Sequence, residues 1–135
     1  MRQLMPLLLL TICVNAFAEW VKVGDRNQLG FEKYVDPDNV KQTGPMAIMR
    51  QVWEIANYSQ PTKDGVVSVK TLAEYNCQTR ELRVVKEQWF TEAWAKGKEV
   101  TAANLNQAVS TWSPITPNSV GAVIIDMACP DGRDG

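Results

Sequence analysis

The sequence predicts an α+β fold, in which an antiparallel β-sheet meander packs against a C-terminal α-helix and one disulfide is formed. Three observations support this prediction. Several runs of the chain alternate apolar and polar residues, as half-buried strands do. The stretch Ser59–Gly65 between the two longest runs ends on Asp-Gly, which is typical of a hairpin loop. The stretch Trp112–Cys129 combines a helix-start signal, an apolar segment and a cysteine.

Residues 1–18 are expected to be a signal peptide. The apolar run Leu4–Val14 has the length of a signal-peptide core, and Ala16–Ala18 fits the small-x-small cleavage pattern. A transmembrane anchor is the weaker interpretation, because a helix needs ~20 apolar residues to cross a bilayer. The mature protein should therefore begin at Glu19, and residues 19–135 should form one domain.

The position of Cys13 bears on where the protein is located. A lipid-modified cysteine needs a small residue immediately before it, and Ile12 is large. We therefore predict that Cys13 is removed with the signal peptide. The predicted location is periplasmic or released, in preference to the outer-membrane surface, and no other stretch of the sequence suggests a membrane span.

Composition excludes several classes of function. The formal net charge is −1, so the chain has no electrostatic footprint for nucleic acid. It has no polybasic segment for an anionic membrane. It also has no histidine, so a Ser-His-Asp or Cys-His catalytic site is ruled out. The sequence accordingly predicts a non-enzymatic protein without a cofactor.

The first part of the domain is expected to contain two short strands. Glu19–Gly24 alternates apolar and polar residues, and Phe31–Val35 forms a second β-like run. Asp25–Gly30 between them should be a turn. In Asp36–Val40, Pro37 removes a ladder donor, so we expect a turn or a single helical turn there.

The middle of the domain is expected to be the antiparallel meander. Met46–Tyr58 is the longest β-like run, and its imperfect alternation predicts a bulge or burial on both faces. After the hairpin loop, Val66–Cys77 should be the return strand. Gln78–Thr79 should make a tight turn into a further strand over Leu82–Phe90.

The segment Thr91–Thr111 is expected to be irregular. Lys96–Lys98 contains a glycine and indicates a turn, and a short strand is expected near Glu99–Thr101.

The C-terminal segment has the spacing of a helix. Ser119 suits the N-cap position and Pro130 acts as a stop, although the β-branched residues between them also suit a strand. Four apolar residues are spaced as a helical stripe, at i, i+3, i+4 and i+7: Val120, Val123, Ile124 and Met127.

Two cysteines lie in the predicted domain, Cys77 and Cys129. In an exported protein an even pair indicates a disulfide. Two free buried thiols or a metal pair are the alternatives. Zinc is disfavoured, because structural zinc sites need four nitrogen or sulfur ligands and the chain has no histidine.

Two pairs of residues are catalytic candidates by residue type, but both have simpler interpretations. Ser68 and Lys70 would share a strand face, but that spacing is common on any sheet surface. Glu74 and Glu81 would act together only if the fold brought them into one cleft, and solvated strand residues are the default.

The five tryptophans are a surplus for a chain of this size: Trp20, Trp53, Trp89, Trp94 and Trp112. In a thin sheet most should lie in the core. A tryptophan left exposed would mark a binding face, because aromatic residues are enriched at interfaces. Trp94, in the least regular segment, is the predicted binding residue.

Short motifs carry a resemblance to a known family. They occur in order over nearly all of residues 19–135: Trp20–Gly24, Tyr34–Pro37 with Val40, Val52-Trp53, Tyr58, Ser68–Lys70, Glu74–Cys77, Arg83, Trp112–Val120 and Cys129. In these motifs the chain resembles the surface-adhesin protein E family, which comprises small exported bacterial domains. The resemblance implies an antiparallel sheet backed by a C-terminal helix, with Cys77 and Cys129 bridged.

The resemblance also implies adhesion. Members of the family bind host matrix or serum proteins, and in some cases haem. Our leading hypothesis is therefore an exported, non-enzymatic interaction domain with a protein partner from the host matrix or the cell envelope, with a homodimer also considered. The alternative is a periplasmic protein that holds a small apolar ligand between sheet and helix.

Overall fold

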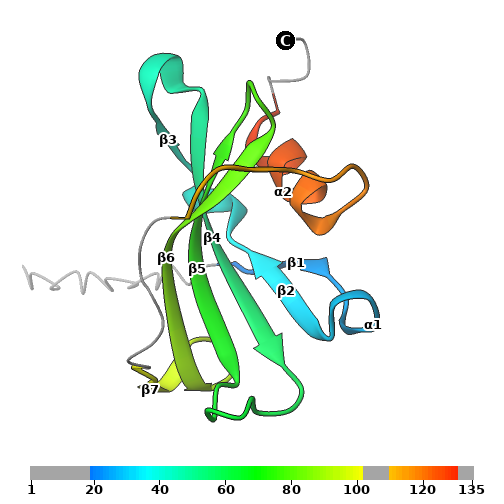
Figure 1. The fold of residues 1–135 in the computed structure, drawn as a ribbon, viewed down its shortest axis with the longest axis vertical. Helices are drawn as coiled ribbons and strands as arrows, with labels where there is room; N and C mark the ends of the chain where they lie inside the picture. The colour runs from blue at the N-terminus through cyan, green and yellow to red at the C-terminus, as the bar shows by residue number, and fades with distance from the viewer. Residues whose placement is uncertain (1–18, 102–109, 131–135) are drawn as a thin grey trace, which may run out of the picture.

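A computed structural model describes residues 19–101 and 110–130 (Figure 1). The predicted signal peptide, its cleavage site and Cys13 lie outside the described residues, except for Glu19 itself. The described chain is mostly β. A long antiparallel sheet curls along the vertical axis of Figure 1, and one helix, α2, lies beside it toward one end.

The strands are β1 (Val21–Gly24), β2 (Phe31–Val35), β3 (Lys41–Thr43), β4 (Met49–Tyr58), β5 (Ser68–Asn76), β6 (Glu81–Glu92), β7 (Lys96–Glu99) and β8 (Ser113–Pro114). The helical elements are α1 (Arg26–Leu29), η1 (Pro37–Asn39), η2 (Pro45–Ala47) and α2 (Val120–Ala128). The sheet has the order β1-β2-β4-β5-β6-β7, with β3 alongside β4 and β8 alongside β6. The antiparallel meander predicted for the middle of the chain is confirmed.

Strands β4 and β5 are the central pair of this meander. Their register runs without interruption from Met49 opposite Asn76 to Asn57 opposite Ser68. The connecting loop turns at Gly65, whose φ of +80° is readily adopted by glycine. Strand β4 buries residues of both faces, which was one of the two expectations for this run, whereas the bulge lies in the β5–β6 pairing instead.

Several local predictions need correction. The segment before β4 is a 3₁₀ turn with Met46 at φ +55°, not the start of the strand. Strand β3 before it was not predicted. Lys96–Lys98 lies within β7 and is not a turn. The chain reverses direction immediately before it, over residues 93–95. The predicted turn at Asp25–Gly30 contains the short helix α1.

The C-terminal helix is confirmed. The Ser119 hydroxyl accepts a hydrogen bond from the Ala122 N–H at 3.2 Å, which caps the helix. The predicted apolar stripe is wrong at Val123, which is 52% exposed. Ile124 of the stripe is fully buried as predicted, and Ile125, which was not in the stripe, is fully buried in place of Val123.

The core lies between α2 and the sheet. Its buried residues are Val35, Val52, Ala73, Tyr75, Ile124, Ile125, Ala128 and Cys129. Cys77, which follows β5, is bonded to Cys129 at the end of α2, 52 positions further along the chain. The predicted disulfide therefore joins the helix to the sheet that it packs against.

Charged groups also occur on the helix side of the sheet. Glu54 is buried, accepts a hydrogen bond from the Tyr75 hydroxyl at 2.8 Å, and lies 2.6 Å from the Lys33 ammonium. Burial and the adjacent Glu54 carboxylate raise the pKa of Tyr75 far above its ordinary value, so this hydroxyl stays protonated. The buried acid is therefore held by one hydrogen bond and one ion pair.

Candidate functional site

The prediction that most tryptophans lie in the core is wrong. All five belong to the described residues and none is buried, with Trp94 the most exposed at 39%. The core is filled by smaller side chains and by the two isoleucines of α2, which leave little room for indole rings in so thin a layer. Trp94 is exposed, as predicted, although it lies on the turn between β6 and β7 and not in an irregular segment.

Register decides on which face each tryptophan lies. Residues that pair across an antiparallel sheet point to the same face, and neighbours along a strand point to opposite faces. Val52 pairs with Ala73, and both belong to the core beneath α2. Trp53 pairs with Leu72 and therefore lies on the face away from α2.

Three more tryptophans gather on this same face. Trp20 lines a cavity with Trp53, Trp94 packs on Tyr34, and Trp112 lies over Arg83. The register places Tyr34 opposite Ile55, and Arg83 opposite Glu74, on the face of Trp53. We call this surface the tryptophan face; it is defined by Trp20, Trp53, Trp94 and Trp112. Trp89 pairs with Val69 and lies on the helix side.

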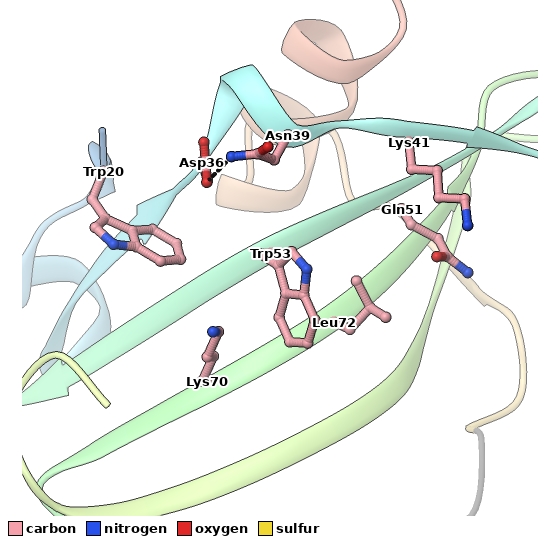
Figure 2. Close-up of a pocket in the computed structure, with 8 residues that line it drawn as sticks. All are labelled: Trp20, Asp36, Asn39, Lys41, Gln51, Trp53, Lys70 and Leu72. Atoms are coloured by element: carbon pink, nitrogen blue, oxygen red, sulfur yellow. Dashed lines mark hydrogen bonds between the residues drawn. The ribbon is translucent and has the colours of Figure 1, made fainter. Parts of the chain in front are cut away.

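A groove runs along the tryptophan face (Figure 2). Its volume is about 540 Å³, and we call it the Trp20–Trp53 groove; it is lined by Trp20, Asp36, Asn39, Lys41, Gln51, Trp53, Lys70 and Leu72. The Lys70 ammonium lies 4.7 Å from the centroid of the Trp53 ring, which is a cation–π contact. The groove therefore combines aromatic walls with charged groups.

The one acidic residue that lines the groove, Asp36, already makes hydrogen bonds within the fold. Asp36 is buried, and its two carboxylate oxygens accept hydrogen bonds from the Asp38 N–H at 3.2 Å and the Asn39 side-chain amide at 2.6 Å. Asp36 thus caps the N-terminus of the 3₁₀ turn η1, which is the single helical turn expected in this segment. Its role in the groove is structural.

Trp94 sits on a strained turn that folds over the tryptophan face. Its φ is +61° and that of Ala95 is +55°, both in the left-handed region. Such a conformation costs roughly 1–2 kcal/mol for each residue other than glycine. The Trp94 N–H donates to the Asn57 side chain at 2.9 Å, and the Ala95 N–H donates to the Ser68 hydroxyl at 3.0 Å. Buried side chains of β4 and β5 therefore hold the turn in place.

The two catalytic candidates take structural positions. The Ser68 hydroxyl is fully buried and donates to the Glu92 carbonyl at 2.6 Å, while Lys70 lies over Trp53. Glu81 pairs with Asn76, two positions from the Glu74–Arg83 pair, and the Glu74 carboxylate is engaged by Arg83. The structure thus brings neither pair together as a catalytic unit.

Glu74 is the centre of a polar network on the tryptophan face. It accepts hydrogen bonds from Thr43, Gln51 and the Arg83 guanidinium, the last at 2.6 Å. Burial acts to raise the pKa of Glu74, but these hydrogen bonds and the charge of Arg83 outweigh it, and the pKa lies below its ordinary value. Arg83 in turn lies 4.5 Å from the centroid of the Trp112 ring.

A smaller cavity lies on the helix side of the sheet, and its lining residues include none of α2. Its volume is about 190 Å³, and Trp89 and Tyr58 contribute to its lining. Within residues 19–101 and 110–130 no cluster of acidic and cysteine side chains could hold a metal ion. Over the same residues, no helix has the length and apolar character needed to cross a membrane.

The sequence predicted the exposure of Trp94 but not the groove. Lys41, Trp53 and Lys70 lie on three different strands, β3, β4 and β5, and no spacing along the chain indicates that they meet. The signal that could have found them is the cross-strand register, which places Lys70 opposite Ile55 and hence on the face of Trp53.

The fold and the sequence both have known counterparts. A selenomethionine form of Haemophilus influenzae protein E has a TM-score of 0.62 and 18% identity, covering 76% of this chain and 83% of that one. A structure of protein E from non-typeable H. influenzae has a TM-score of 0.62 and 15% identity, covering 88% and 83%. At such identities the likeness concerns the fold. No curated protein sequence matches the chain.

The family assignment comes from the sequence over most of its length. The model of the family described as surface-adhesin protein E matches residues 20–130. This range includes every element of the described fold, the disulfide and the tryptophan face. The chain therefore belongs to the surface-adhesin protein E family.

Proposed function

We propose that the chain is an exported, non-enzymatic adhesin-like protein that binds a protein partner on its tryptophan face. Membership in a surface-adhesin family supports a binding role. The observation that carries the proposal is the gathering of four unburied tryptophans on the face away from α2. Tryptophan is among the residues most enriched at the energetic centres of protein interfaces.

The turn that carries Trp94 gives further support. Backbone strain at a bulky exposed residue is retained where surrounding contacts fix it, and such positions cluster at functional sites. Here the strain falls on the most exposed of the five tryptophans, and two buried side chains, Asn57 and Ser68, hold its turn in place. A preordered aromatic anchor lowers the entropic cost of binding.

The proposed partners are host matrix proteins or proteins of the bacterial envelope. The alternative, a small apolar ligand between sheet and helix, receives less support, because Ile124 and Ile125 fill that interface and are fully buried. The cavity of about 540 Å³ lies on the opposite face. We therefore favour a protein partner over an enclosed apolar ligand.

The experiment is a binding measurement with residues 19–135 against a panel of immobilised extracellular-matrix proteins and isolated envelope proteins. Trp94→Ala and Trp53→Ala should each weaken binding at least tenfold, as expected for aromatic anchors. The matched control is Trp89→Ala, on the helix side, which should bind as the unmodified protein does. Equal binding by all three variants would refute the proposed face. Light scattering on the same sample shows whether two copies associate.

Export is proposed with a start at Glu19 and without a lipid anchor. Intact-mass spectrometry of the protein recovered from bacteria should give the mass of residues 19–135. A mass that includes a lipid on Cys13 would place the protein at a membrane surface instead.

A further inference from the structure

We infer that the Trp20–Trp53 groove binds a short segment of the partner protein in which a carboxylate side chain stands next to an apolar one. This inference rests on the proposed function and specifies what the face recognises. It follows from which charges in the groove are already paired, from how Lys70 is held, and from the size of the cavity.

The charge of the groove differs from that of the whole chain. The formal net charge of the chain is −1, yet the groove contains two lysines, Lys41 and Lys70, and one acid. That acid, Asp36, is buried and bonded to Asp38 and Asn39. Among residues 19–101 and 110–130, no carboxylate oxygen lies within 4.0 Å of either lysine ammonium. The groove therefore presents unpaired positive charge.

The other polar groups of the groove are partly engaged. The Gln51 amide nitrogen donates to Glu74, and the Asn39 amide nitrogen donates to Asp36. The two ammonium groups are thus the principal charged donors left for a ligand. Because an ammonium group has donors and no acceptor, the ligand must supply acceptor oxygens, and a carboxylate supplies them with the opposite charge.

Lys70 is positioned before any ligand arrives. Its ammonium lies 4.7 Å from the centroid of the Trp53 ring, so part of the conformational freedom of the long side chain is already lost. A carboxylate that pairs with this ammonium pays less ordering entropy than it would with a freely moving lysine. The same indole ring offers an apolar surface directly beside the charge.

The apolar part of the ligand has its own surface. Trp20 and Trp53 stand in the groove with Leu72 on the neighbouring strand (Figure 2). A volume of about 540 Å³ falls within the range of roughly 300–1,000 Å³ typical of ligand pockets. This space suits a few side chains of a peptide segment. A carboxylate with an apolar neighbour matches both surfaces at once.

The test uses three blocked pentapeptides and the protein comprising residues 19–135. The probes are Ac-Gly-Glu-Leu-Glu-Gly-NH2, its counterpart with both glutamates replaced by glutamine, and its counterpart with both replaced by lysine. Binding is followed by NMR through the indole N–H signals, assigned with single Trp→Phe variants. The glutamate peptide should shift the signals of Trp20 and Trp53, and the glutamine peptide should bind about three to ten times more weakly.

Two lysine variants locate the effect. Lys70→Met and Lys41→Met keep most of the side-chain length and remove the charge, and each should weaken binding of the glutamate peptide about threefold to tenfold. Lys63→Met, in the exposed β4–β5 loop, is the matched control and should change nothing. Raising the salt concentration should weaken binding of the glutamate peptide more than binding of the glutamine peptide.

Several outcomes would overturn the inference: no shift with the glutamate peptide at millimolar concentration, equal binding of the glutamate and glutamine peptides, or unchanged binding in both groove variants. Binding of a neutral hexose oligomer in the groove without dependence on either lysine would also overturn it. These results are distinct from failure of the proposed function, which is judged from the tryptophan variants against whole proteins. If binding of whole proteins depends on Trp53 and Trp94 but on neither lysine, the proposed function stands and this inference is refuted.

Discussion

The indole ring of Trp94 packs on the phenol ring of Tyr34, with 4.5 Å between their centroids and 57° between their planes. This contact joins the β6–β7 turn to strand β2, and β4 and β5 lie between β2 and β6 in the sheet. The turn thus crosses the face of the sheet. Tyr34 is itself fixed by its hydroxyl, which donates to Glu32 at 2.7 Å.

The contact between the two rings can be measured with a double-mutant cycle. Tyr34→Ala and Trp94→Ala should show a coupling free energy of about 0.5–1.5 kcal/mol in urea unfolding, because aromatic pairs contribute about that much beyond the area that they bury. The control pair is Trp89→Ala with Trp94→Ala, since these rings lie on opposite faces and should be additive. A coupling near zero for Tyr34 and Trp94 would mean that the hydrogen bonds to Asn57 and Ser68, and not the ring contact, hold the turn.

Strain in the turn predicts opposite effects at two neighbouring positions. Ala95→Gly should stabilise the fold by up to about 1 kcal/mol, because glycine adopts a φ of +55° without steric cost but loses more entropy on folding. Gly97→Ala should destabilise it. Gly97 has a φ of +79°, and a Cβ there would lie 2.5 Å from the Thr91 hydroxyl. Thermal unfolding of the two variants beside the unmodified protein decides this, and a destabilised Ala95→Gly variant would contradict it.

Removal of the disulfide should be costly. In the chain-entropy model a closed loop of 52 residues is worth about 4 kcal/mol, so the variant with both Cys77→Ala and Cys129→Ala should lose up to that amount in urea unfolding. Adding reductant to the unmodified protein should have a similar effect and should leave the variant unaffected. If reductant changes neither protein, the bond contributes little to stability.

Acid should weaken the Glu74 network. Because the pKa of this buried carboxyl is lowered in the folded state, its stabilising effect is present above its ordinary pKa of 4.5 and is lost as the pH falls through the folded-state value. Glu74→Gln should therefore unfold at a lower temperature than the unmodified protein at pH 7, with a difference that shrinks on acidification below pH 4.5. A difference that does not vary with pH would assign the loss to packing.

The features that sequence predicted well depend on short-range chemistry. Gly65 in the β4–β5 loop and Ser119 before α2 act within a few residues of themselves, through positive φ and through a hydrogen bond to a nearby N–H. Such signals are legible in a single sequence. The pairing of Cys77 with Cys129 was also predictable, because few partners were available.

The features that were missed depend on contacts between distant parts of the chain. Strands β3 and β8 are three and two residues long and exist because β4 and β6 offer them a ladder. Lys96–Lys98 contains a glycine that suggests a turn. That glycine instead lies against Thr91 and Glu92 of β6, and the chain reverses direction over residues 93–95. The tryptophan face appears only once the register of five strands is known, which no local pattern supplies.

The Cys77–Cys129 bond also governs what happens when the chain is cut. The turn that carries Trp94 lies between the two cysteines, so a protease that cleaves it leaves both fragments covalently joined. A cut in the β4–β5 loop lies outside that ring and leaves its fragments joined only by strand pairing. In a protease-rich surrounding, the exposed hairpin at Trp94 can thus be nicked without release of either half. The nicked form would migrate as one species on a gel until a reducing agent is added.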